Sequence, residues 1–253
     1  MRPLALALSF LTRLPVRTGE FGEHEPATSL SCFPVVGALI GSVLWLVQLA
    51  LAPHLGAWLT ALALVASSAL ITGALHLDGV ADLADALGGG RGDRSRMLDI
   101  MRDPRIGAHG ATGLLLVLAG KLLASAELTA RGATVAITWP ILLAPLWARF
   151  LCVVAIKAFP YARPSGLGLS FHVHAKRRHV LFAALPCLAA IALLLNENAP
   201  PILLGSALSC SAVLALLLAL RVHRLLGGIT GDVHGASIEL CELLVLVTGC
   251  WVN

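Results

Sequence analysis

The sequence predicts an all-α fold: a polytopic integral membrane bundle of about seven transmembrane helices. Hydrophobic residues make up 58% of the 253 residues and charged residues only 13%, whereas soluble domains typically carry about 25% charged residues. The apolar residues come in blocks of about 20, the length of helix that crosses a bilayer. We therefore expect one integral membrane domain over residues 1–253, with lipid as its surroundings and no nucleic-acid partner.

Seven apolar blocks follow one another along the chain. The expected spans are 33–53, 57–77, 109–128, 133–158, 180–195, 200–220 and 235–252. Before them, Met1 to Phe10 form a short apolar run that no cleavage site of the signal-peptide type follows, so we expect a retained segment at the membrane interface.

The positive charges alternate between the two sides of the expected bundle. The tight turns that separate spans one and two, three and four, and five and six hold almost no Lys or Arg. The N-terminal segment and the longer loops hold most of the 18 Lys and Arg residues of the chain. By the positive-inside rule these loops, near 78–108, 159–179 and 221–234, are cytoplasmic, and the C-terminus lies on the other side.

Three aspartates follow the second expected span directly. Asp78, Asp82 and Asp85 are four and then three residues apart, so a helix places all three on one narrow face. Their carboxylates repel one another, and charge next to lipid is costly. A hard divalent ion such as Mg²⁺ or Mn²⁺, which carries a phosphorylated substrate, would neutralise them. The alternative is a helix end exposed to water, where aspartate is ordinary.

A second acidic group lies near the start of the seventh expected span. Asp232, Glu239 and Glu242 fall on one side of a helix, and ionisable groups within an apolar run usually face a site or a polar partner. We expect this group to contact a metal or the substrate. The alternative is neutralisation of the glutamates by Lys121 or Arg149, the cations within the spans.

Candidate phosphate contacts lie in two glycine-containing segments. The basic segment 88–107 contains Arg102 and Arg105, and arginine pairs well with phosphate oxygens. The turn 227–232 contains Gly231, where the backbone can approach an anion closely. His76 precedes the first aspartate by two residues and could orient a ligand. Each feature has a plainer explanation, because topology alone demands basic loops, a glycine turn can simply connect two spans, and histidine is ordinary at an interface.

These residues carry a family resemblance. The stretch 75–89, LHLDGVADLADALGG, resembles the signature of the bacterial cobalamin synthase family, the adenosylcobinamide-GDP ribazoletransferases (cobalamin-5′-phosphate synthases). The segment 101–110, MRDPRIGAHG, is similar to a second family pattern. Three shorter landmarks, at 10–16, 33–37 and 227–236, occur in the expected order, so the resemblance extends from end to end of the chain.

The resemblance implies the last step of cobalamin nucleotide-loop assembly at a bacterial inner membrane, with the active site at the cytoplasmic face. The substrates would be adenosylcobinamide-GDP and α-ribazole or its 5′-phosphate, the products adenosylcobalamin or its 5′-phosphate and GMP, and the cofactor Mg²⁺. The roles expected on this basis are metal binding by Asp78, Asp82, Asp85, Asp232 and Glu239, catalysis by Asp82, Asp85 and Asp232, and substrate or phosphate binding by His76, Arg102, Arg105 and Gly231.

Other membrane proteins use intramembrane or interfacial acids. The CDP-alcohol phosphotransferases have an Asp-Gly-x-x-Ala-Arg element, whereas here residues 78–82 read DGVAD. Aromatic prenyltransferases space their first acids by three and then four residues, the reverse of this chain. A transporter predicts neither the arginine- and glycine-rich loop nor acids gathered at one membrane face. Gly37 and Gly41, four residues apart, permit close helix packing within the chain or in a homo-oligomer.

Overall fold

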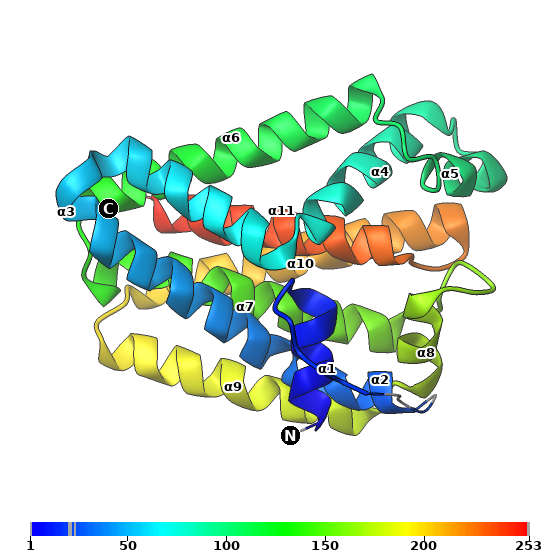
Figure 1. Ribbon diagram of the computed structural model, residues 1–253, viewed down its shortest axis with the longest axis horizontal. Helices are drawn as coiled ribbons and strands as arrows, with labels where there is room; N and C mark the ends of the chain where they lie inside the picture. Colours follow the sequence, from blue (N-terminus) through cyan, green and yellow to red (C-terminus); the bar gives the residue numbers. More distant parts are fainter. Residues whose placement is uncertain (1, 20–21, 23, 252–253) are drawn as a thin grey trace.

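The computed structural model describes residues 2–19, 22 and 24–251, and over these residues the chain is helical without a strand. The prediction of an all-α fold is therefore confirmed (Figure 1). The α-helices are α1 (Arg2–Leu11), α2 (Glu25–Ser29), α3 (Phe33–Thr72), α4 (Leu75–Gly89), α5 (Arg94–Ile100), α6 (Ala108–Arg131), α7 (Val135–Ala158), α8 (Leu167–His174), α9 (Arg177–Asn196), α10 (Pro201–Leu226) and α11 (Gly231–Gly249).

Among the described residues, five helical runs are long and apolar enough to cross a membrane. The protein is therefore a multi-pass membrane protein, but the expected count of seven spans is not confirmed. The first run covers 25–72, which merges the first two expected spans, and α11 is outside the set. The reason for the second difference is composition, because α11 carries Asp232, Glu239 and Glu242 within 19 residues.

α3 reverses direction within one continuous run of helix. Gly56 has φ +69° and ψ 177°, a conformation that glycine adopts without strain, and Pro53 removes a helical hydrogen bond just before it. Figure 1 shows the parts before and after this kink running in opposite directions, in blue and cyan. The turn expected at 53–56 is therefore present. The second part ends at Thr72, five residues earlier than expected, because Gly73 and Ala74 both have positive φ.

Two of the segments expected to be cytoplasmic loops contain helix. The 78–108 segment is largely helical, since α4 and α5 lie within it. α10 continues to Leu226 and α11 begins at Gly231, so the connection expected at 221–234 is only 227–230. Helical periodicity extends past the apolar blocks in both places, and hydropathy alone does not detect that extension.

α11 is the central helix and packs against α4, α6, α7 and α10. α3 packs closely on α7, because a side chain at Gly37 or Gly41 would collide with the backbone of Pro145 or Leu142. The pair of glycines therefore serves packing within the chain, and a homo-oligomer stays a prediction. Large hydrophobic side chains remain exposed along the outer helices, with Ile202 81% exposed, as a lipid-facing surface requires.

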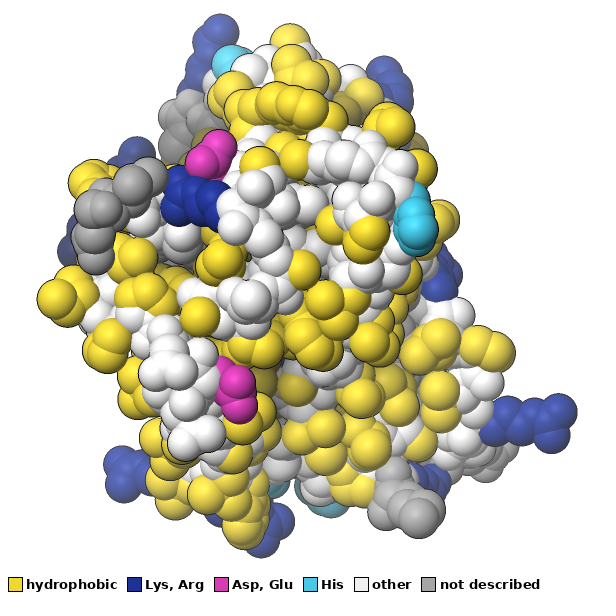
Figure 2. Space-filling view, turned by 90° about the vertical axis from the view of Figure 1, so that its left-hand side faces the viewer, with side chains coloured by type: hydrophobic (Ala, Val, Ile, Leu, Met, Phe, Trp, Pro, Cys, Tyr) yellow, Lys and Arg dark blue, Asp and Glu magenta, His cyan; other side chains and the backbone are white. Residues whose placement is uncertain are grey.

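The two ends of the bundle differ. α4, α5 and α8 gather at one end in Figure 1, while Figure 2 shows the opposite end, where hydrophobic side chains predominate and acidic ones are few. At the first end the loops are joined to one another. Arg94 donates to the carbonyl oxygens of Leu226 (2.7 Å) and Ala162 (3.1 Å), and Ile229 exchanges backbone hydrogen bonds with Pro160 and Ala162. The three basic loops thus form one connected unit.

Candidate functional site

The candidate site forms where α4 crosses the N-terminal end of α11. A side chain at Gly79 would collide with the backbone of Asp232, and one at Gly235 would press against the backbone of His76. These two glycines let the helices approach closely, as small residues do in membrane bundles. The close approach brings the carboxylates of Asp78 and Asp82 near that of Asp232.

An acidic groove of about 610 Å³ lies at this crossing. Five residues predicted from the sequence line it: Asp78, Asp82, Asp232, Arg102 and Arg105. Burial, and then the charges of Asp78 and Asp232, raise the pKa of Asp82 to about 7. The groove therefore holds carboxylates that repel one another beside arginines from the 101–107 segment, a combination suited to a phosphate carried by a cation.

The two arginines of the groove differ in whether a carboxylate pairs with them. Arg105 pairs with Asp103, with its Nε 2.9 Å from Oδ1, and this hydrogen bond lowers the pKa of Asp103 to about 2. Arg102 is exposed, and its side chain forms no ion pair within the described part of the chain. Arg102 is thus free to meet an anion, whereas Arg105 must first leave a carboxylate.

Asp85 lies on α4 but is occupied by a structural contact. Its Oδ2 accepts a hydrogen bond from the backbone N–H of Gly107 (2.7 Å) and its Oδ1 from that of Gly110 (2.8 Å). A carboxylate at a helix N-terminus stabilises both the free N–H groups and the helix dipole. Asp85 therefore positions α6, and its expected metal and catalytic roles stay predictions.

Glu239 lies in a buried ionic cluster, away from the acidic groove. Lys121 pairs with Glu239 and with Glu242, the latter at 2.6 Å, and Arg149 pairs with Glu242 at 2.6 Å. All four side chains are buried, so each charge is neutralised by a partner on another helix. The structure thus shows the alternative of neutralisation by Lys121 and Arg149, and the expected role of Glu239 as a metal ligand stays a prediction. In the described residues no three His, Cys, Asp or Glu side chains already converge as a metal site.

A second cavity, of about 310 Å³, meets the acidic groove at the crossing. Asp78 and Asp232 line both spaces, and the predicted residues His76 and Gly231 line the second cavity only. The structure therefore distributes seven of the nine predicted residues over two adjacent spaces that share the carboxylates of Asp78 and Asp232.

Three other polar residues of the second cavity, Arg163, His172 and His234, were not predicted as site residues. Arg163 donates from Nη2 to Asp232 Oδ2 at 2.7 Å. His172 has its Nδ1 2.9 Å from the carbonyl oxygen of Phe159 and its Nε2 3.0 Å from the Nε2 of His234. Since a carbonyl only accepts, His172 Nδ1 donates to it, and His172 Nε2 accepts from His234. Arg163 and His172 belong to a basic loop whose charge topology alone explains, so spacing gave no signal for them.

The remaining wall of this cavity is aromatic. Phe171 has its ring centroid 4.8 Å from that of Phe10 and 5.9 Å from that of Phe33. Phe10 comes from α1 and Phe33 from the start of α3. Both lie within the short segments, 10–16 and 33–37, that resemble family landmarks, which was the one signal for them in the sequence.

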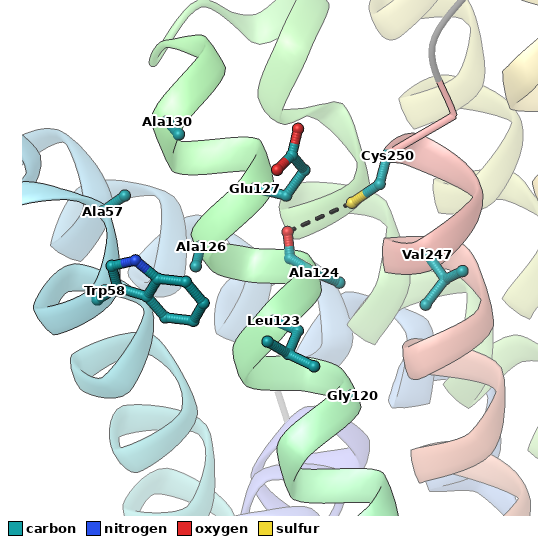
Figure 3. Close-up of a pocket in the computed structure, with 10 residues that line it drawn as sticks. All are labelled: Ala57, Trp58, Gly120, Leu123, Ala124, Ala126, Glu127, Ala130, Val247 and Cys250. Carbon is teal, nitrogen blue, oxygen red and sulfur yellow. Dashed lines mark hydrogen bonds between the residues drawn. The ribbon is translucent and has the colours of Figure 1, made fainter.

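A groove at the opposite end of the bundle contains none of the predicted site residues. It has a volume of about 510 Å³ and lies between the second part of α3, α6 and α11, with Trp58, Leu123 and Val247 among its lining side chains (Figure 3). Its carboxylate, Glu127, pairs with Arg131 at 3.0 Å. This apolar groove offers no charge for a phosphorylated substrate.

Comparisons with known proteins agree on one family. The family model described as cobalamin-5-phosphate synthase matches residues 3–250. The adenosylcobinamide-GDP ribazoletransferase of Desulfitobacterium hafniense (strain Y51) is 37% identical over 248 residues, covering 98% of this chain and 96% of the relative. That of Pseudomonas putida (strain W619) is 40% identical, covering 98% of each. That of Syntrophobacter fumaroxidans (strain DSM 10017 / MPOB) is 41% identical, covering 95% of this chain and 94% of the relative.

No solved structure is significantly similar to this chain. The family model and the relatives cover the acidic motif of α4, the 101–110 segment and the start of α11 together. The chain belongs to the cobalamin-5-phosphate synthase family of transferases.

Proposed function

We propose that this protein transfers the adenosylcobinamide-phosphate group of adenosylcobinamide-GDP to α-ribazole or its 5′-phosphate, with release of GMP. The observation that carries the proposal is the acidic groove between α4 and α11, in a chain about as long as the ribazoletransferases that it matches over 98% of its length. Two connected spaces that meet at Asp78 and Asp232 suit a reaction between two substrates.

The donor set of the groove fits Mg²⁺. Asp78, Asp82 and Asp232 provide carboxylate oxygens, the hard ligands that Mg²⁺ prefers, and the pKa of Asp82 is raised first by burial and then by the negative charges of Asp78 and Asp232. We infer that Asp78 and Asp232 would hold the ion and that the carboxylate of Asp82 stays free of it. When bound, Mg²⁺ supplies neutralisation of the diphosphate charge.

Several residues of the chain would hold the diphosphate and limit its motion. Arg102 lies free at the rim of the groove and can pair with phosphate oxygens. Arg163, beside Asp232 at the junction, can pair with an oxygen of the reacting phosphate. Phosphoryl transfer needs little covalent chemistry from the protein, so positioning and charge neutralisation of this kind supply most of the catalysis.

Asp82 is the residue suited to take the proton of the attacking hydroxyl. The 3′-hydroxyl oxygen of ribazole forms a bond to the cobinamide-linked phosphorus, and the bond from that phosphorus to the bridging oxygen breaks. GMP leaves with the electron pair of that bond, and the hydroxyl proton passes to the Asp82 carboxylate. Asp82 lines the groove beside Asp78 and Asp232, where its carboxylate can accept that proton.

The location is part of the proposal. We infer that the end with α4, α5 and α8 faces the cytoplasm of a bacterial inner membrane, because the basic loops gather there. Both soluble substrates would then reach the groove from the compartment that makes them.

The test uses purified full-length protein in liposomes with adenosylcobinamide-GDP, α-ribazole and Mg²⁺. GMP release and corrinoid product are measured for the wild type, with and without EDTA, and for Asp82→Asn. The control is Asp99→Asn, which changes an exposed acid of α5 outside both cavities. We expect Mg²⁺-dependent product from the wild type and the control and none from Asp82→Asn. Product formation by Asp82→Asn at the wild-type rate would refute the assigned role.

A further inference from the structure

We propose that the aromatic cavity bounded by α1, α3, α8 and α11 is the binding site for the benzimidazole base of the acceptor, and that the acidic groove takes the nucleotide-linked corrinoid. This assignment rests on the function proposed above and adds a subsite for each substrate. The boundary between the subsites is formed by Asp78 and Asp232, the two residues that line both spaces.

Size separates the two substrates. The cavity, at about 310 Å³, lies at the lower end of the range of about 300–1,000 Å³ that holds small ligands. A ribazole nucleoside is a molecule of that class, whereas a corrinoid ring with its side chains is far larger. The groove is about twice as large and opens along the 101–106 segment, so it can hold the phosphate end of the donor while the corrin ring extends beyond it.

The chemistry of the walls separates the bases. Phe10, Phe33 and Phe171 form one side of the cavity, with ring centroids 4.8 to 6.0 Å apart. A dimethyl-substituted benzimidazole is apolar around most of its edge and packs favourably against such rings. Guanine has polar groups around its edge, which would lose their hydrogen bonds to water against this wall.

Polar groups lie where the sugar would emerge from the aromatic wall. His172 and His234 are hydrogen-bonded to each other at 3.0 Å, and both line the cavity together with Tyr161. Beyond them come Asp232 and its partner Arg163. A nucleoside whose base lies among the phenylalanines therefore directs its ribose hydroxyls to the junction, which is where a phosphate held in the groove would be attacked.

Crosslinking tests this assignment without requiring turnover. Phe10→benzoylphenylalanine places a photoreactive ring in the aromatic wall, and Phe10 is already 37% exposed, so the fold tolerates the added bulk. Ile106→benzoylphenylalanine is the matched control at an exposed position of the groove. Both full-length variants in liposomes are irradiated with radiolabelled α-ribazole or radiolabelled adenosylcobinamide-GDP. We expect ribazole to label position 10 and the donor to label position 106; the reverse pattern, or ribazole labelling at neither position, would overturn the proposal.

Kinetics of Phe10→Ala provide the second readout. Loss of one ring of the wall should raise the KM for α-ribazole about tenfold, with the KM for the donor unchanged. Phe10→Leu keeps an apolar side chain and should restore most of the affinity, which distinguishes a lost contact from a misfolded helix. If the wild type forms product but Phe10→Ala raises the KM for the donor and not for α-ribazole, the subsite assignment is refuted and the proposed function is not. A wild type that releases no GMP would refute the proposed function itself.

Discussion

The buried ionic cluster between α6, α7 and α11 makes a quantitative prediction about stability. Glu242 accepts from both Lys121 and Arg149 at 2.6 Å, and its side chain is only 5% exposed. Glu242→Gln leaves two buried cations facing the single charge of Glu239. Removing one partner of a buried ion pair typically costs about 3–5 kcal/mol, so the free energy of unfolding should fall by that amount.

Unfolding in lipid bicelles with increasing SDS measures this loss, with tryptophan emission as the signal because Trp139 is almost fully buried. The matched control is Lys121→Met combined with Glu239→Gln, which removes one positive and one negative charge and leaves the Arg149–Glu242 pair intact. A charge-balanced replacement of this kind is often nearly neutral, so we expect the double variant within about 1 kcal/mol of the wild type. Equal losses for both variants would show that packing, and not charge balance, sets the energy, and would refute the reasoning.

Three further predictions concern the site. Asp85→Ala should lower the free energy of unfolding, measured in bicelles with SDS, by about 1–2 kcal/mol, because α6 loses its two capping hydrogen bonds. Lost activity at unchanged stability would instead support the metal role of Asp85. Gly79→Ala should abolish GMP release, because its Cβ would collide with the α11 backbone. The control Gly205→Ala meets no atom within 4 Å and should retain full activity. An active Gly79→Ala would contradict the close crossing of α4 and α11. In metal-free buffer the melting temperature should fall as the pH rises from about 4 to about 7, because in this window the folded state retains the Asp82 proton that the unfolded chain releases. Asp82→Asn should remove that fall, and an unchanged profile in the variant would exclude Asp82 as its source.

Residue spacing was sufficient to predict part of the site. Offsets of four and seven place Asp78, Asp82 and Asp85 on α4, and the structure brings the first two to Asp232. Spacing does not show which of several polar groups a side chain will meet. Asp85 therefore contacts the N-terminus of α6, and Glu239 contacts Lys121, partners that depend on how helices distant in sequence pack together.

The periodicity of the sequence did not predict the aromatic cavity. Its walls come from α1, the start of α3, α4, α7, α8 and α11, and no regular interval relates residues on such separate elements. α11 lies outside the set of apolar spans because three acidic side chains fall within its 19 residues, although the rest of the helix is apolar. Helix α4 was indicated by the spacing of its three aspartates and not by hydropathy, because a run with three aspartates is not an apolar block.

The hydrogen bonds of Arg94 join α5 to one side of the proposed acceptor cavity and not to α1 on the other side. Arg94 donates to main-chain oxygens at the end of α10 and in the α7–α8 connection. These hydrogen bonds couple the position of α5 to both segments. Arg94 forms no hydrogen bond with the described residues of α1, and Arg13, just after α1, donates its backbone N–H to the carbonyl oxygen of Ile71 near the end of α3. α1 also packs against α2 and α3. A displacement of α5 would therefore move Arg163 and Asp232 together and leave Phe10 in place.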